Sequence, residues 1–113
     1  MPLSERVRIE IFIPDPPSPA YQNLLDELAS EFSYSFGGCT QVPASGLCCS
    51  SNGQIVSDKI KILFADAVLR WERNHLALGM YVDAVKRAAQ RALLNEEAVL
   101  VSVHPVCHGV NPI

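Results

Sequence analysis

An Asn52-Gly53 pair between two strand-like runs constrains this chain more than any other feature. Both central residues of a type I′ turn need positive φ, which Asn and Gly tolerate best, so the pair predicts a β-hairpin. A two-residue loop would place Val42 opposite Leu63. We therefore expect an antiparallel sheet with this hairpin as its spine.

The two arms of the predicted hairpin differ in character. Pro43 lies in the first arm, and proline cannot donate a ladder hydrogen bond, so this arm should be an edge strand or contain a bulge. In the second arm, lysines alternate with apolar residues, which is typical of a sheet with one buried and one wetter face. The expected core members are Ile60, Ile62 and Phe64, and the expected open-face members are Lys59 and Lys61.

The residues before the hairpin predict one strand and one helix. Arg6 to Ile13 alternates, with Val and Ile on one face and mostly charged residues on the other, as in a half-buried strand. Ser18-Pro19 is a helix start, with serine as N-cap and proline at the first helical position. Apolar residues then recur at helical spacing as far as Phe32, which indicates an amphipathic helix.

The residues after the hairpin predict a second helix and a last strand. Between Asp66 and Gly79 we expect a short helical turn that Asp66 could cap. A second helix should run from about Leu78 to about Leu94. Ala98 to His104 alternates as a strand, and Pro105 should close it.

The resulting order is β-α-β-β-α-β in a single domain of residues 1–113. It predicts an α+β ferredoxin-like sandwich, in which two helices cover one face of a four-stranded antiparallel sheet. Right-handed crossovers place the first and third strands in the centre. The predicted core joins the first strand and both helix stripes with inward residues of the later strands: Val7, Ile9, Ile11, Leu24, Leu28, Phe32, Ile60, Ile62, Phe64, Val82, Val85, Val99 and Val101.

Two stretches of the chain carry a resemblance. The hairpin pattern G-x-C-C-x-x-N-G-Q-I-V at residues 46–56 and the ending A-V-L-V-S-V-H-P-V-C at 98–107 resemble a family of small uncharacterised bacterial proteins with a ferredoxin-like fold. The likeness covers the two ends of the chain better than residues 67–80, which look like an insertion. It implies the fold, and it transfers no functional residue because the family has no assigned activity.

The composition and charge of the chain argue against several classes of function. At 113 residues, with 49% hydrophobic and 19% charged residues, the chain is an ordinary globular domain. A net charge of −3 offers no electrostatic footprint for nucleic acid, and no apolar run reaches the ~20 residues that span a bilayer. The early charges of the N-terminus are unlike a signal peptide. We expect a cytosolic protein with free cysteine thiols and no cofactor.

Three small groups of residues could bind a metal or take part in catalysis. His104, Cys107 and His108 could hold a soft metal, or Cys107 could pair with His104 as a nucleophile. No local feature lowers a thiol pKa and no second ligand cluster follows, so a solvated tail without metal is the simpler interpretation. Pro2 could act as an amine base after removal of Met1, but residues 4–6 separate it from the first strand.

The functional hypothesis concerns the face of the sheet that the helices leave bare. We expect a non-catalytic binding or regulatory module that forms a homodimer through this face, with apolar residues at the centre and charged ones around them. The expected interface residues are Arg8, Glu10, Phe12, Lys61, Leu63, Leu100 and His104. One alternative is a small enzyme with a pocket between the sheet and residues 66–79. Another is that this segment, with Trp71, folds across the bare face as an internal lid.

Overall fold

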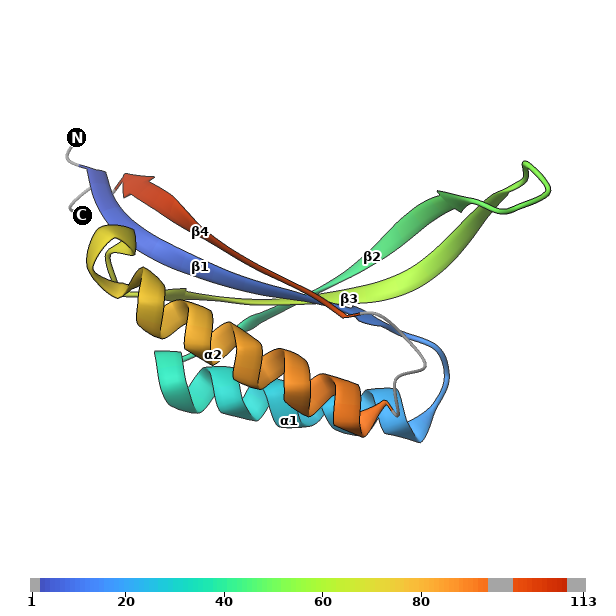
Figure 1. Ribbon diagram of the computed structural model, residues 1–113, viewed down its shortest axis with the longest axis horizontal. Helices are drawn as coiled ribbons and strands as arrows, with labels where there is room; N and C mark the ends of the chain where they lie inside the picture. The colour runs from blue at the N-terminus through green and yellow to red at the C-terminus, as the bar shows by residue number, and fades with distance from the viewer. Residues whose placement is uncertain (1–2, 94–98, 110–113) are drawn as a thin grey trace.

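Two helices lie on one face of a four-stranded sheet in the computed structural model, which describes residues 3–93 and 99–109 (Figure 1). The elements are β1 Leu3–Pro14, α1 Pro19–Phe36, β2 Thr40–Cys49, β3 Ile55–Ala67, α2 Trp71–Ala92 and β4 Leu100–Gly109. Their order confirms the predicted β-α-β-β-α-β sandwich. Among the described residues, no helix has the length and apolar character needed to cross a membrane.

The strand order is β2-β3-β1-β4, and all neighbours are antiparallel. As predicted, β1 and β3 occupy the centre, and Pro43 lies in an edge strand. The prediction that Pro105 ends the last strand was wrong, because β4 continues to Gly109 and pairs Pro105 with Val7. An edge strand tolerates proline, since only one of its sides must supply ladder hydrogen bonds.

Helix α1 forms as its sequence predicts. Ser18 is the N-cap in an extended conformation and Pro19 is the first helical residue, although the serine side chain makes no capping hydrogen bond. Gly37 ends the helix at φ 85°, a left-handed conformation that glycine adopts without steric cost, and its N–H donates to the Ser33 carbonyl. The apolar stripe faces the sheet, and its buried members are Leu24, Leu25, Leu28 and Phe32.

Helix α2 begins about two turns earlier than predicted, at Trp71. Asp66 does not cap it but lies inside β3. Asn74 and Gly79 both lie within α2 despite their low helix propensity. Asn74 supports the helix start, because its Oδ1 accepts the Arg70 N–H at 3.1 Å. Leu78, Val85 and Ala89 are buried, so packing along this face outweighs the weak local propensity.

The hairpin has a three-residue loop in place of the predicted two-residue turn. The Ser50 N–H donates to Gln54 O at 2.8 Å, and Gly53 N–H donates to Ser50 O at 3.0 Å. Gly53 carries the positive φ of 82°. This geometry is typical of a type I turn followed by a left-handed glycine. The register therefore differs by one residue, and Val42 faces Ile62 instead of Leu63.

The two faces of β3 are the reverse of the prediction. Leu63, opposite Ile11, is fully buried under the helices, and the next inward residues are Ala65 and Ala67. The predicted core members Ile60, Ile62 and Phe64 are only half-buried and lie on the bare face. Lys61 lies on the helix side with Leu63, where its Nζ is 4.0 Å from Asp15 Oδ2. A shift of one position in a strand exchanges its faces completely.

The core fills the space between the sheet and the two helices. Its buried members are Val7, Ile9, Ile11, Ile13, Leu24, Leu25, Leu28, Phe32, Leu63, Ala65, Leu78, Val85, Ala89, Leu93 and Val101. Rings of Phe32, Phe36 and Tyr81 join the two helices, with centroids 5.4–6.3 Å apart. Burial raises the pKa of Tyr81 to about 12, and the nearby Glu31 carboxylate adds to this rise.

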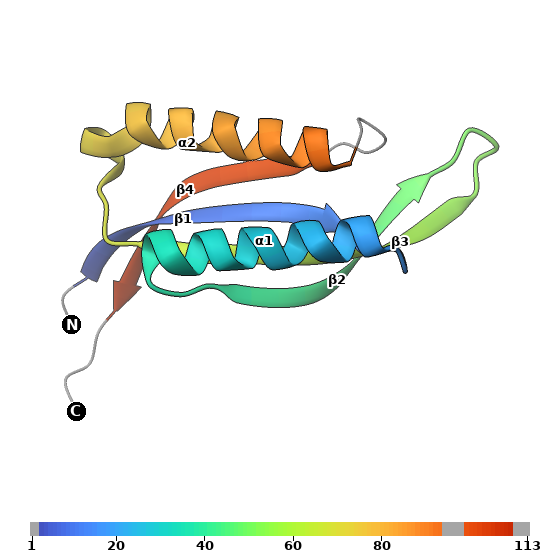
Figure 2. The ribbon, with the colours of Figure 1, turned by 90° about the horizontal axis from the view of Figure 1, so that it is seen from below.

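Beyond the pairing of Pro14 with Ile60, the hairpin continues without support from β1. We call residues 45–59 the ribbon. Figures 1 and 2 show that it extends past the end of the helices as two strands alone. Leu47 and Ile55 are 72% and 76% exposed there. A pair of strands of this kind is only marginally stable by itself in water.

The assignment of the β3 faces can be tested by stability. Leu63→Ala removes a fully buried side chain and should lower the free energy of unfolding by about 2–5 kcal/mol, measured by urea denaturation. The same substitution at Leu76, which is 76% exposed on α2, should change it by less than about 0.5 kcal/mol. Equal losses from the two variants would mean that Leu63 does not face the core.

Candidate functional site

The face of the sheet opposite the helices, which we call the open face, is polar at one end and apolar at the other. Side chains of facing residues form rows across β3, β1 and β4. The successive rows are Asp66–Arg8–His104, then Phe64–Glu10–Ser102, then Ile62–Phe12–Leu100. The polar end lies toward the start of β1, and the apolar end lies toward the ribbon.

Arg8 and Asp66 form the best-defined contact on the open face. Arg8 Nε donates to Asp66 Oδ1 at 2.7 Å and Nη2 donates to Oδ2 at 2.9 Å, in the two-bond geometry of a guanidinium with a carboxylate. The guanidinium also lies 4.4 Å from the centroid of the Phe64 ring. These hydrogen bonds hold the pKa of Asp66 below its usual value and raise the pKa of Arg8.

Two histidines of β4 border this ion pair. His108 Nε2 lies 3.3 Å from Asp66 Oδ2, without the alignment of a hydrogen bond, and His104 Nε2 lies 3.6 Å from Glu10 Oε1. Strand alternation directs Cys107 to the other side of the sheet. The H-x-x-C-H sequence therefore does not converge. Within residues 3–93 and 99–109 no group of three potential metal ligands forms, and all four cysteines are free thiols.

The apolar end of the open face presents large side chains that nothing in the described chain covers. Leu100 is 60% exposed and Val42 38% exposed. Phe12, Ile62 and Phe64 are half-buried beside them. Exposed apolar residues are ordinary one at a time, but a contiguous group of them marks an interaction surface.

Five of the seven predicted interface residues lie on the open face: Arg8, Glu10, Phe12, Leu100 and His104. Lys61 and Leu63 lie on the opposite side, for the register reason given above. Sequence reasoning missed several members of this face, among them Ile62, Phe64, Asp66 and His108. The apolar pair could have been found only with the correct register of β3. Asp66 and Arg8 are 58 residues apart, and no local pattern joins them.

Residues 66–79 do not cross the open face. Asp66 and Ala67 complete β3, and the chain passes into α2 in the helix layer, where Trp71 is 39% exposed. The internal lid, which was the alternative to a dimer, is therefore wrong. The segment instead borders a hollow of about 450 Å³ with the start of β1. Its lining comprises Ser4, Glu5, Arg6, Val68, Leu69, Arg70, Arg73 and Asn74.

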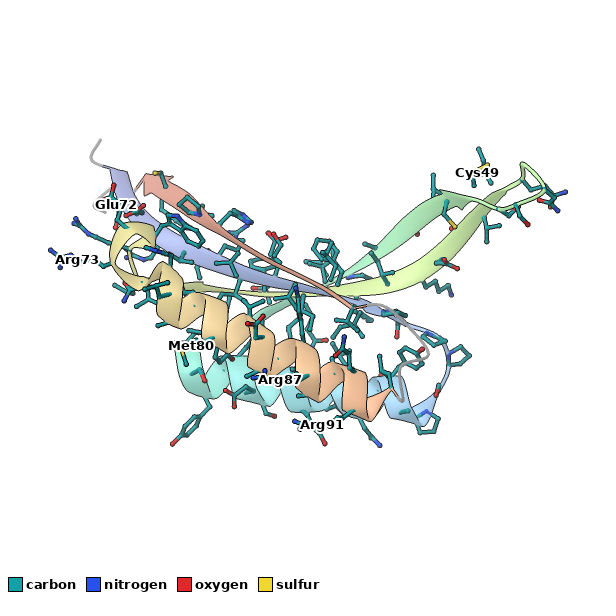
Figure 3. The ribbon with its side chains drawn as sticks, viewed as in Figure 1. Cys49, Glu72, Arg73, Met80, Arg87 and Arg91 are labelled. Atoms are coloured by element: carbon teal, nitrogen blue, oxygen red, sulfur yellow. The ribbon has the colours of Figure 1, made fainter. Side chains whose placement is uncertain are left out.

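The hollow forms because β3 ends at Ala67, opposite Val7, and does not reach residues 3–6 of β1. Pairing between the two strands stops at Val7 and Ala67, so residues 3–6 of β1 pair only with β4. The link 68–70 fills part of the open edge, and α2 starts beside it. Figure 3 shows Arg73 at this end of α2, extending outward near the start of β1. The hollow thus has three arginines, contributed by two separate parts of the chain.

Comparisons with known proteins support the fold. No family model matches the chain, and no curated protein matches it. Among solved structures, a phage SAM lyase in complex with S-methyl-5'-thioadenosine is similar, with a TM-score of 0.56 and 14% identity over 93% of this chain and 90% of that one. The nitrogen regulatory PII-like protein CPII from Thiomonas intermedia K12, bound to ADP, AMP and bicarbonate, has a TM-score of 0.50 and 17% identity over 99% and 100%.

The contact between Arg8 and Asp66 predicts a pH dependence. Because the pKa of folded Asp66 lies below its usual 3.8, the ion pair stabilises the fold above that pH and the stabilisation is lost as the pH falls below it. Asp66→Asn should therefore lose less stability than the wild type between about pH 4 and about pH 2, measured by urea denaturation. Asp58→Asn, at an exposed aspartate of the ribbon, is the control and should retain the wild-type slope. An unchanged slope in Asp66→Asn would contradict the assigned role.

Proposed function

We propose that this protein is a non-catalytic binding module whose working unit is a homodimer formed through the open face. The observation that supports it most is the uncovered apolar group of Phe12, Ile62, Phe64 and Leu100 at one end of the open face. Soluble monomers rarely leave such a surface bare. Two-fold pairing of identical surfaces is the commonest way to cover one.

The charges of the open face permit two copies to meet. Because Arg8 and Asp66 already neutralise each other within one chain, a second copy does not set two unpaired arginines or two unpaired aspartates against each other. The apolar rows lie beside this ion pair, and interfaces usually combine apolar residues with polar ones at their rim.

The size of the face indicates that the ribbon takes part. Four strands spaced about 4.8 Å apart and about eight residues long cover on the order of 500 Å². A standard interface buries about 800 Å² on each partner. The ribbon continues β3 directly, and its exposed Val56 lies on the same side of the strand as Ile62 and Phe64, where it can add contact area. Dimerisation would also give this unsupported pair of strands the packing it lacks.

A small enzyme is the second candidate function, and the hollow beside α2 favours it. The hollow lies between the sheet and residues 66–79, where a pocket was expected. However, its lining contains no histidine or cysteine, and three of its eight residues are arginines. Groups that bind anions outnumber the one carboxylate of the lining, that of Glu5. The hollow therefore agrees better with ligand binding than with proton-transfer catalysis.

The two similar structures agree with a binding role and add no detail to it. Both were determined with small molecules bound, in one case to a lyase and in the other to a regulatory protein. At 14% and 17% identity the likeness concerns the fold. The same fold therefore occurs in an enzyme and in a regulator, and the choice for this chain depends on its own surfaces.

Light scattering tests the proposed dimer. We expect the wild type to have the mass of two chains at high micromolar concentration, and Phe12→Asp to have the mass of one, because the substitution places a charge among apolar side chains. Leu100→Asp is a second variant at a 60% exposed position, where the monomer tolerates a polar residue.

Leu76→Asp provides the matched control. Leu76 is an equally apolar and exposed residue, but it lies on α2, away from the open face. We expect this variant to remain a dimer. A wild type that stays monomeric, or a loss of dimer in Leu76→Asp as well, would contradict assembly through the open face.

A further inference from the structure

The three arginines of the hollow have no carboxylate partner within the described chain. Ion pairs within 4.0 Å involve Arg8 and Lys61, whereas Arg6, Arg70 and Arg73 form none among residues 3–93 and 99–109. Arg6 Nη1 donates to Ser4 Oγ at 2.5 Å and to the Glu5 carbonyl, so it is held in place by neutral groups. Arg70 and Arg73 are exposed.

The surroundings of these three arginines differ from those of Arg8. There a carboxylate takes both hydrogen bonds of the guanidinium fork. At the hollow the acidic lining residue is Glu5, which lies beside three guanidinium groups. The lining therefore has a surplus of two positive charges in a protein whose net charge is −3. This local positive charge, on a protein whose overall charge is negative, attracts anions to the hollow.

The chemistry of the lining selects the kind of anion. Guanidinium groups match the oxygens of carboxylate and phosphate with two parallel hydrogen bonds. A single carboxylate carries one charge and occupies one guanidinium, whereas a phosphate group carries up to two charges and offers three or more oxygens. Ser4 and Asn74 add neutral side chains that can donate hydrogen bonds. A surplus of two charges therefore suits phosphate better than carboxylate.

We propose that the hollow between the start of β1 and the start of α2 binds a small phosphorylated molecule through Arg6, Arg70 and Arg73. Its volume of about 450 Å³ falls in the range of small-molecule sites, so it has room for more than a phosphate group. The proposal adds a ligand class to the binding function proposed above, and it depends on that function in no other way. All the lining residues come from one chain, so a monomer contains the complete site.

The hollow borders the polar end of the open face, since Arg6 precedes Arg8 on the same side of β1, and it lies three rows from Phe12 at the apolar end. Arg70 and Arg73 line the hollow from the start of α2, in the helix layer. Leu100 and Phe12 lie farther along the sheet, two rows beyond Arg8. A variant that disrupts the dimer surface should thus leave the hollow intact.

Calorimetric titration with inorganic pyrophosphate tests the proposal. We expect the wild type to bind with a dissociation constant of about 1 mM or below, and the affinity to fall as sodium chloride is added. Arg70→Gln and Arg73→Gln should each weaken binding about tenfold, since each removes a charged hydrogen-bond donor. Both residues are exposed, so the variants should keep the wild-type circular dichroism and thermal midpoint.

Arg87→Gln is the matched control, because Arg87 is an exposed arginine of α2 that lies away from the hollow (Figure 3). It should bind pyrophosphate as the wild type does, and Leu100→Asp should do so even as a monomer. An absence of binding at about 10 mM pyrophosphate would overturn the proposal. Equal losses in Arg87→Gln and Arg73→Gln would also overturn it, since they would indicate a general effect of charge. The dimer hypothesis is decided separately, by mass.

Discussion

The orientation of β3 determines both the core and the surface of this protein. Leu63, Ala65 and Ala67 face the helix layer, in which α1 lies over β3 and α2 lies over β4. Because strand side chains alternate, the same arrangement commits Ile62, Phe64 and Asp66 to the open face. A shift of β3 by one residue would turn the Asp66 carboxylate into the core without Arg8 beside it. Burying an unpaired charge costs a large amount of free energy. The ion pair with Arg8 therefore helps to fix the register.

The two proposed surfaces follow from where strands end. At one end β3 stops opposite Val7, so residues 3–6 of β1 pair only with β4, and the arginine hollow forms along the free edge of β1. At the other end β1 stops at Pro14, and β3 continues with β2 alone. The open face lies between these two ends. The central strands thus differ in extent, and each difference creates a place where a ligand or another chain can bind.

Much of the fold could be predicted from local sequence. Ser18-Pro19 and the helical spacing to Phe32 define α1, and the alternation in β1 defines both of its faces. The faces of β3 could not be predicted, because large apolar residues occur on both of them and lysines at 59 and 61 suggested the wrong one. Asn74 and Gly79 concealed the start of α2, since tertiary packing overrode their weak propensity. The Arg8–Asp66 contact depends on a register that only the folded chain supplies.

The ribbon is mechanically connected to the core, because β3 runs without interruption from Ile55 to Ala67. Its base is clamped where Asp15 N–H donates to Lys59 O at 2.9 Å and Lys61 Nζ approaches Asp15 Oδ2 at 4.0 Å. The strand cannot slide by one residue without exchanging Leu63 for a residue of the open face. A force applied to the ribbon would therefore act along β3 on the part of the strand that carries Phe64 and Asp66.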